Sequence, residues 1–225
     1  MHTLAAVIVA LLLSEGAAAQ KAVSLPTEDG GVVYADVYGE QGDRGIVLAH
    51  GGRSNKESWQ EQARTLAAAQ FRALALDFRG CGKSRGPGQS DSMSARLHLD
   101  VLAAVRNLRK TGAKSVSVIG GSRGGGAAGN ASIASQPGEI DRLILLGASP
   151  NGPADKLKSS TFFIVARDDS NEDGRRLPRI QMQFKKAPEP KEPIIPDGSA
   201  HAQFLFQTNR GERVMREILR FLSAK

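Results

Sequence analysis

The stretch Val116-Ser117-Val118-Ile119-Gly120-Gly121-Ser122-Arg123-Gly124-Gly125-Gly126 is the most informative part of this 225-residue chain. Its β-branched start predicts a strand, and the small residues after Ser122 predict a helix. Gly120, Ser122 and Gly124 match G-x-S-x-G, the strand-turn-helix corner that exposes a nucleophilic serine. Glycine suits the flanking positions because so tight a turn leaves no room for a Cβ atom. Short patterns of common residues also arise by chance, so the rest of the chain must supply a base, an acid and donors for an oxyanion.

Further strands are predicted on both sides of this corner. Each is a short, continuous apolar run of the type that a parallel sheet buries on both faces. These runs span residues 45–50, 72–77, 115–119, 142–147 and 161–166. Two earlier strands, 23–25 and 31–38, are expected to meet in a hairpin at Glu28-Asp29-Gly30-Gly31. The proline-rich stretch 187–196 allows only a weak edge strand around 194–195, because proline lacks a ladder N–H.

Stretches with helical spacing separate these strands. The first follows a capping-box pattern, Ser54-Asn55-Lys56-Glu57, and runs from Trp59 to Ala67. The later helices are expected at 94–110, 124–134, 172–186 and 210–221. Strands that alternate with helices predict an α/β fold with a mostly parallel sheet and helices on both faces. We find no internal repeat and no linker, and we therefore expect a single domain over residues 20–225.

The first nineteen residues differ from the rest of the chain. Leu4 to Leu13 is an apolar run too short to cross a bilayer, which needs about 20 residues. Ala17-Ala18-Ala19 is typical of a signal-peptide cleavage site, although Met1-His2-Thr3 lacks the usual basic residue. We expect residues 1–19 to be a cleaved export signal; the alternative is an uncleaved membrane anchor. The mature protein is then expected to be periplasmic or secreted, without stable membrane insertion.

Composition excludes several other classes of protein. The apolar and charged fractions, 40% and 24%, are ordinary for a globular domain, and the single cysteine, Cys81, allows no internal disulfide. The formal net charge of +7 favours anionic surfaces or substrates only mildly. No basic block is interleaved with aromatic residues, so we expect no nucleic-acid partner. No group of His, Cys and carboxylates has metal-ligand spacing, so we expect no metal and no cofactor. The sequence leaves the oligomeric state open.

A nucleophilic serine needs a base, usually an imidazole that a carboxylate holds in place. Of the four histidines, His2 lies in the expected signal, His50 ends an early strand and His98 lies within a helix. Only His201 lies late in the chain, in a loop before the final helix. The chain order nucleophile, acid, base therefore selects His201 as the base for Ser122.

The acid is expected after a strand that lies between the serine and the histidine. Asp168 and Asp169 follow the strand predicted at 161–166. We favour Asp169, because the turn after such a strand usually places its second or third residue over the sheet. Asp168 remains the alternative.

Two backbone N–H groups must face the negative charge that develops on the substrate oxygen. One is expected from Arg123, which follows Ser122 at the positive end of a helix. The other is expected from the loop His50-Gly51-Gly52-Arg53, with Gly52 as the donor. We interpret His50 as a structural residue that orients this loop.

Together these motifs resemble the α/β-hydrolase superfamily, and within it the compact dienelactone-hydrolase-like or serine-esterase members. The resemblance covers nearly all of residues 23–223. It rests on His50-Gly51-Gly52, Asp77 to Ser84, Gly120 to Gly124, Asp168-Asp169 and Gly198 to His201. It implies an eight-stranded sheet and a Ser122–His201–Asp169 triad that works through an acyl-enzyme. The sequence departs from the family pattern in two places: prolines interrupt the eighth strand, and the loop 147–161 is too short for a substantial lid. The short loop predicts an open, shallow site.

Two other glycine patterns would indicate nucleotide binding, and both fail. Gly82-Lys83-Ser84 resembles the end of a phosphate-binding loop, but Asp77 stands where that motif needs glycine. The stretch 124–129 matches G-x-G-x-x-G, but the next strand ends in Ala148-Ser149 rather than in an acidic residue.

The sequence thus predicts an exported serine hydrolase that cleaves a carboxylic ester or related acyl bond in a small molecule. Acyl transfer and peptide hydrolysis use the same triad, so both remain open. A non-catalytic binding protein can also share this fold.

Overall fold

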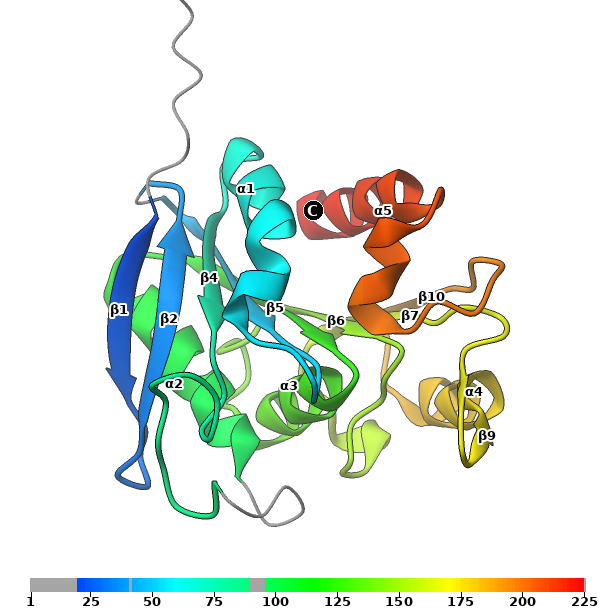
Figure 1. The fold of residues 1–225 in the computed structure, drawn as a ribbon, viewed down its shortest axis with the longest axis horizontal. Helices are drawn as coiled ribbons and strands as arrows, with labels where there is room; N and C mark the ends of the chain where they lie inside the picture. Colours follow the sequence, from blue (N-terminus) through cyan, green and yellow to red (C-terminus); the bar gives the residue numbers. More distant parts are fainter. Residues whose placement is uncertain (1–19, 41, 90–95, 225) are drawn as a thin grey trace, which may run out of the picture.

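The computed structural model describes residues 20–40, 42–89 and 96–224 (Figure 1). Eight strands form one sheet in the order β1-β2-β4-β3-β5-β6-β7-β10. They are β1 (Lys21–Pro26), β2 (Val32–Tyr38), β3 (Arg44–Ala49), β4 (Arg72–Leu76), β5 (Ser115–Gly121), β6 (Arg142–Leu146), β7 (Ser160–Ile164) and β10 (Lys191–Ile194). The predicted export signal, residues 1–19, lies outside the described residues.

The sheet is parallel from β4 to β10, and only β1 and β2 run antiparallel to their neighbours. Helices cover both of its faces (Figure 1). They are α1 (Gln60–Ala68), α2 (Leu97–Lys110), α3 (Arg123–Ala134), α4 (Arg176–Lys186) and α5 (Gly211–Ser223). This architecture confirms the predicted α/β fold class.

The continuous apolar run of β3 serves two cores at once. Val47 and Ala49 pack into the core beneath α2 and α3, while Ile46 and Leu48 pack into the core beneath α1 and α5. All four side chains are fully buried. Burying one large apolar side chain stabilises a fold by roughly 1.5–3 kcal/mol, so a strand with such residues on both faces belongs in the middle of a sheet.

The helix predicted at 172–186 begins four residues late, at Arg176. Its first residues instead form a small hairpin in which β8 (Ser170–Asn171) pairs with β9 (Gly174–Arg175). Asp173-Gly174 is a strong turn signal, and Gly174 has a φ of +101°, which a helix does not allow. The helix predicted from position 94 is described from Leu97 onward, and its expected start lies outside the described residues.

The capping box predicted at Ser54 does not form. The chain makes a 3₁₀ turn, η1 (Lys56–Trp59), before α1 begins, and no side chain caps either helix. The carboxylate of Asp77, at the end of β4, accepts the backbone N–H of Lys56 at 2.8 Å instead. An acceptor from a neighbouring strand therefore replaces the expected local one.

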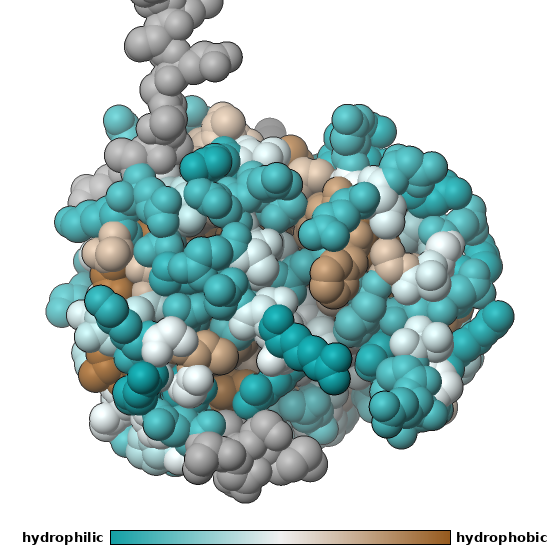
Figure 2. Space-filling model, in the orientation of Figure 1, coloured by the Kyte–Doolittle hydropathy of each residue, from teal (hydrophilic) through white to brown (hydrophobic). Residues whose placement is uncertain are grey.

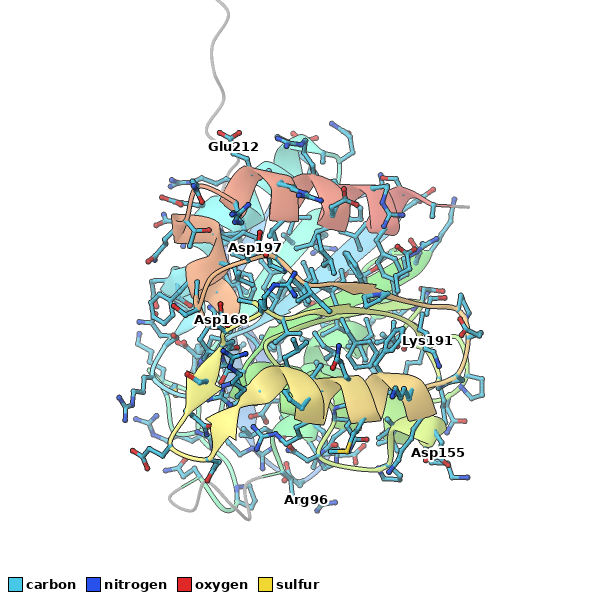
Figure 3. The ribbon with its side chains drawn as sticks, turned by 90° about the vertical axis from the view of Figure 1, so that its right-hand side faces the viewer. Arg96, Asp155, Asp168, Lys191, Asp197 and Glu212 are labelled. Atoms are coloured by element: carbon cyan, nitrogen blue, oxygen red, sulfur yellow. The ribbon has the colours of Figure 1, made fainter. Side chains whose placement is uncertain are left out.

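The eighth strand forms despite its prolines. The N–H groups of β7 and of the loop after it donate to carbonyls of the β10 segment, Val165 to Ile194 at 3.2 Å and Arg167 to Pro196 at 2.9 Å. Proline lacks an N–H but keeps its carbonyl, and an edge strand needs only one bonded side. Asp197 and Asp168 lie at one end of this sheet edge, and Lys191 lies at the other (Figure 3).

Hydrophilic residues cover most of the described surface on the face drawn in Figure 2, and apolar residues form small patches between them. Among the helices of the described ranges, none combines the length and the apolar character that crossing a bilayer requires.

Candidate active site

Ser122 occupies a strained corner between β5 and α3. Its φ and ψ are +52° and −119°, a conformation that costs a non-glycine residue roughly 1–3 kcal/mol. The neighbouring backbone leaves no space for side chains at the flanking glycines. A Cβ atom on Gly120 would lie 2.5 Å from the carbonyl oxygen of Gly124, and one on Gly124 would lie 2.3 Å from that of Ala49. The turn therefore requires glycine on both sides of the serine.

Three predicted residues come together at this corner. Nε2 of His201 lies 2.8 Å from the Ser122 hydroxyl, and Nδ1 of His201 lies 2.8 Å from Oδ2 of Asp169. The Asp169 side chain is fully buried, while that of His201 is 26% exposed. An imidazole protonated on Nδ1 donates to the carboxylate and accepts the serine proton on Nε2.

The alternative acid, Asp168, lies outside this constellation. Its carboxylate forms an ion pair with Arg175 at 3.1 Å and is 46% exposed. Its backbone N–H donates to the carbonyl of Gly198 at 2.9 Å. That bond continues the pairing of the β7 and β10 segments as far as the loop that carries His201. The proline-rich β10 segment therefore holds this loop beside Asp169.

Gly147 leaves space for the side chains of His201 and Asp169. It follows β6 with a φ of +59°. A Cβ atom there would lie 2.9 Å from Nδ1 of His201 and 3.0 Å from Oδ2 of Asp169. No motif in the sequence points to Gly147, and its one signal is that a glycine follows a buried strand.

The two predicted oxyanion donors lie on adjacent segments. A Cβ atom on Gly52 would lie 3.6 Å from Cδ of Arg123, so the loop after β3 runs beside the start of α3. In the described part of the chain neither backbone N–H donates to another protein group. Neither of the two N–H groups is therefore occupied by a hydrogen bond within the described residues.

His50 holds the loop that carries Gly52. The side chain is buried, and the desolvation this causes lowers the pKa of the imidazole. A neutral ring with its proton on Nδ1 donates to the carbonyl of Gly51 at 2.7 Å, and Nε2 accepts the N–H of Phe78 at 3.2 Å. These contacts agree with a structural role for His50.

Gln203 connects the same loop to the segment that carries His201. Its Oε1 accepts the backbone N–H of Gly51 at 3.0 Å, and its Nε2 donates to the Ser58 hydroxyl at 2.7 Å. Gln203 lies only two residues after His201, in the turn η3 (Ala202–Gln207). No motif in the sequence pointed to this residue.

Two open hollows flank Ser122. The first, the His201 hollow, has a volume of about 660 Å³, and the residues that line it include Gly52, His201 and Phe204. The second, the α4 hollow, has a volume of about 680 Å³ and lies between Ser149-Pro150-Asn151 and the start of α4. A smaller apolar hollow of about 280 Å³, between α4 and β10, contains none of the predicted site residues.

The segment between β6 and β7 packs down rather than covering the site. Its short turn η2 (Ala154–Lys156) and Leu157 contribute buried side chains to the core beneath α3. The backbone N–H groups of Asn151 and Gly152 both donate to the side-chain oxygen of Asn130 on α3. The segment forms no lid over Ser122. Across the described ranges, no three His, Cys, Asp or Glu side chains converge as metal ligands would.

Known proteins share this fold. The family model described as "alpha/beta hydrolase fold" matches residues 46–184. The chain is 26% identical over 154 residues to a protein named non-heme chloroperoxidase from Streptomyces lividans, a match that covers 68% of this chain and 50% of that protein. The chain spans about half the length of the curated relatives it matches.

Solved structures of other proteins superpose on almost the whole of this chain. An esterase from Pyrococcus furiosus superposes with a TM-score of 0.79 at 18% identity and covers 96% of both chains. An esterase from Exiguobacterium antarcticum superposes with a TM-score of 0.73 at 16% identity, over 91% of this chain and 100% of that one. Identities this low establish the shared fold alone.

Proposed function

The chain belongs to the α/β-hydrolase fold family, and we propose that it is an exported serine hydrolase that cleaves a carboxylic ester or related acyl bond. One observation carries this proposal: two 2.8 Å contacts connect Asp169 through His201 to a serine held on a strained corner beside two open hollows. The names of the esterases that share the fold agree with this chemistry.

The reaction begins when Oγ of Ser122 attacks the acyl carbonyl. The serine proton moves to Nε2 of His201, and the bond from Oγ to the carbonyl carbon forms. When the tetrahedral intermediate collapses, the bond to the leaving group breaks, and Nε2 returns its proton to that group. A water molecule then attacks the acyl-enzyme and gives its proton to Nε2. In the second collapse the bond from Oγ to the carbonyl carbon breaks and Nε2 returns its proton to Oγ, which releases the acid and restores the serine.

The other residues act on charge and orientation. The carboxylate of Asp169 stabilises the imidazolium that forms twice in each cycle. The backbone N–H groups of Gly52 and Arg123 bind the oxyanion, and losing one such donor typically raises the barrier by about 3 kcal/mol. The strain at Ser122 keeps the hydroxyl exposed above the sheet edge.

Export is part of this proposal because of residues 1–19. Their apolar run and the small residues at its end are typical of a cleaved signal, and such a signal would direct the mature protein to the periplasm or out of the cell. The single cysteine agrees with a chain that folds without an internal disulfide.

An acceptor other than water is the second candidate. The same acyl-enzyme transfers its acyl group to an alcohol, or to an amine in the reverse of peptide cleavage. With hydrogen peroxide as the acceptor it would release a peracid, and the haloperoxidase names of the curated relatives favour testing that acceptor. Product analysis with each acceptor separates these reactions.

Replacing the nucleophile tests the proposal. Ser122→Ala removes the attacking oxygen and keeps the Cβ atom, so we expect ester hydrolysis to fall by several orders of magnitude while circular dichroism stays unchanged. Full activity in this variant would contradict the mechanism. A wild-type protein that folds but hydrolyses no ester would favour a binding protein on the same fold.

A further inference from the structure

The two hollows beside Ser122 differ in charge. The His201 hollow contains two arginines, Arg53 and Arg176, and two carboxylates, from Glu172 and Asp173. The α4 hollow contains three arginines and a single carboxylate, that of Asp173. Only the α4 hollow therefore carries an excess of positive charge next to the nucleophile.

Arg176 reaches both the catalytic acid and the α4 hollow. Its Nε forms an ion pair with Oδ1 of Asp169 at 3.2 Å, although the two atoms are not aligned for a hydrogen bond. Within the described residues this buried Nε has no hydrogen-bond acceptor, and the Arg176 side chain as a whole is only 20% exposed. A guanidinium has five N–H donors, so the N–H groups on its two terminal nitrogens can bind a ligand while Nε stays paired with Asp169.

Arg179 lies three residues further along α4, on the same side of the helix as Arg176. Like charges at this spacing repel one another, which an anion between them relieves. Among the described residues, Arg179 has no ion pair, whereas neighbouring Arg175 pairs with Asp168. The other polar groups that line the α4 hollow, Asn151 and Gln183 among them, can donate hydrogen bonds to the same anion.

We propose that the α4 hollow binds a carboxylate group of the substrate, so that the enzyme prefers half-esters and other acid-bearing esters to neutral ones. Arg176 and Arg179 hold the carboxylate, while Ser122 attacks the ester carbonyl at the edge of the same hollow. Charge-assisted hydrogen bonds to a carboxylate are about twice as strong as neutral ones, which makes the preference measurable. This inference rests on the proposed function.

Two matched pairs of esters test the inference with the mature protein in a pH-stat. Ethyl hydrogen glutarate and ethyl pentanoate differ by a carboxylate on the acyl side, and 4-acetoxybenzoate and its methyl ester differ by one on the alcohol side. For at least one pair we expect kcat/KM to be about tenfold or more higher for the anionic member, as one charge-assisted contact predicts. The preference should shrink as salt is added.

Three arginine variants identify the residues responsible. Arg176→Gln and Arg179→Gln should each lower the anionic-to-neutral ratio of kcat/KM several-fold. Arg175→Gln is the matched control: it removes the same charge from the same segment but lines neither hollow, so the ratio should stay within about twofold, as screened surface charge predicts. If Arg176 served only to hold Asp169, Arg176→Gln would slow both esters equally and leave the ratio unchanged.

The outcomes separate this inference from the proposed function. Hydrolysis of neutral esters with no preference in either pair would overturn the carboxylate site and leave the hydrolase intact. If Arg175→Gln lost the preference for anionic esters as Arg176→Gln and Arg179→Gln do, the preference would come from net charge. That result would also overturn the proposed carboxylate site. Failure to hydrolyse any ester, together with no labelling of Ser122, would contradict the proposed function and this inference with it.

Discussion

Oε1 of Gln203 accepts the backbone N–H of Gly51 at 3.0 Å, although the two residues lie 152 positions apart. Gly51 precedes the predicted oxyanion donor Gly52, and Gln203 follows the predicted base His201 by two residues. One side chain therefore connects the loop that carries Gly52 to the segment that carries His201.

Gln203→Ala removes this connection without touching the reacting atoms. The oxyanion loop then loses a bond that orients it, so we expect kcat to fall about tenfold, a part of what losing a whole donor costs, with KM changed by less than about threefold. Gln207→Ala, in the same turn but outside both hollows, is the control. Steady-state kinetics on one neutral ester check the prediction, and equal effects of the two variants would contradict it.

The two adjacent aspartates should respond very differently to amidation. Asp169→Asn removes the charge beside His201 and favours the wrong tautomer, so kcat should drop by roughly 10³–10⁴. Asp168→Asn breaks only a half-exposed ion pair, and kcat should stay within about threefold. A larger loss in Asp168→Asn than in Asp169→Asn would reverse the assignment of the acid.

Strain at the nucleophile predicts a trade between stability and activity. Ser122→Gly relieves the positive φ, whereas Ser122→Ala keeps it. Relief of the strain stabilises Ser122→Gly, while the greater chain entropy of glycine in the unfolded state offsets part of this gain. We therefore expect the free energy of unfolding of Ser122→Gly to be about 1 kcal/mol higher than that of Ser122→Ala. Urea titrations of both variants measure this difference in free energy of unfolding. Equal stabilities would mean that the corner stores no strain.

A buried ion pair between Arg79 and Asp29, which line neither hollow beside Ser122, predicts a pH-dependent stability. Nη1 of the buried Arg79 lies 2.6 Å from Oδ2 of Asp29, and this hydrogen bond lowers the pKa of Asp29 to about 2. Because the pKa of an unfolded aspartate is about 3.9, the stabilisation is complete above that pH and is lost as the pH falls towards 2. Asp29→Asn should therefore cost about 2 kcal/mol at neutral pH.

Urea unfolding at pH 7 and pH 3 tests this second stability prediction. The gap between wild type and Asp29→Asn should narrow at the lower pH. Asp43→Asn, which breaks an exposed pair with Lys114, should change stability by less than about 1 kcal/mol at either pH. A gap that widened on acidification would show that Asp29 has the opposite sign of linkage.

The sheet and the serine corner could be predicted because the forces that form them are local in sequence. A strand buried on both faces must be apolar throughout, as 45–50 is, and the corner around Ser122 excludes Cβ atoms within a few residues. Counting histidines then left His201 as a single base, because the other three lie in the wrong elements. The order nucleophile, acid, base along the chain was enough to predict that His201, 79 positions after Ser122, is the partner of that serine.

Contacts between distant segments were beyond this kind of prediction. No sequence pattern around Gln203 indicates that its side chain contacts Gly51. Likewise, no pattern around Arg176 indicates an ion pair with Asp169. The Asp77 carboxylate took the place of the expected Ser54 cap for the same reason: the acceptor comes from another strand. The prolines led to the prediction of only a weak edge strand, because proline lacks the N–H that a ladder uses. The β7 segment instead donates its own N–H groups to carbonyl oxygens of the proline-rich stretch, and proline does not remove these.

Labelling with a fluorophosphonate probe tests the central claim most directly, because the probe reacts only where a nucleophile, a base and oxyanion donors act together. Residues 20–225 should acquire one adduct, which peptide mass spectrometry should locate on Ser122. Ser122→Ala and His201→Ala should remain unlabelled while keeping the wild-type circular dichroism spectrum. A folded wild-type protein that takes up no probe, or that carries the adduct on another residue, would contradict the assignment of Ser122 as the nucleophile.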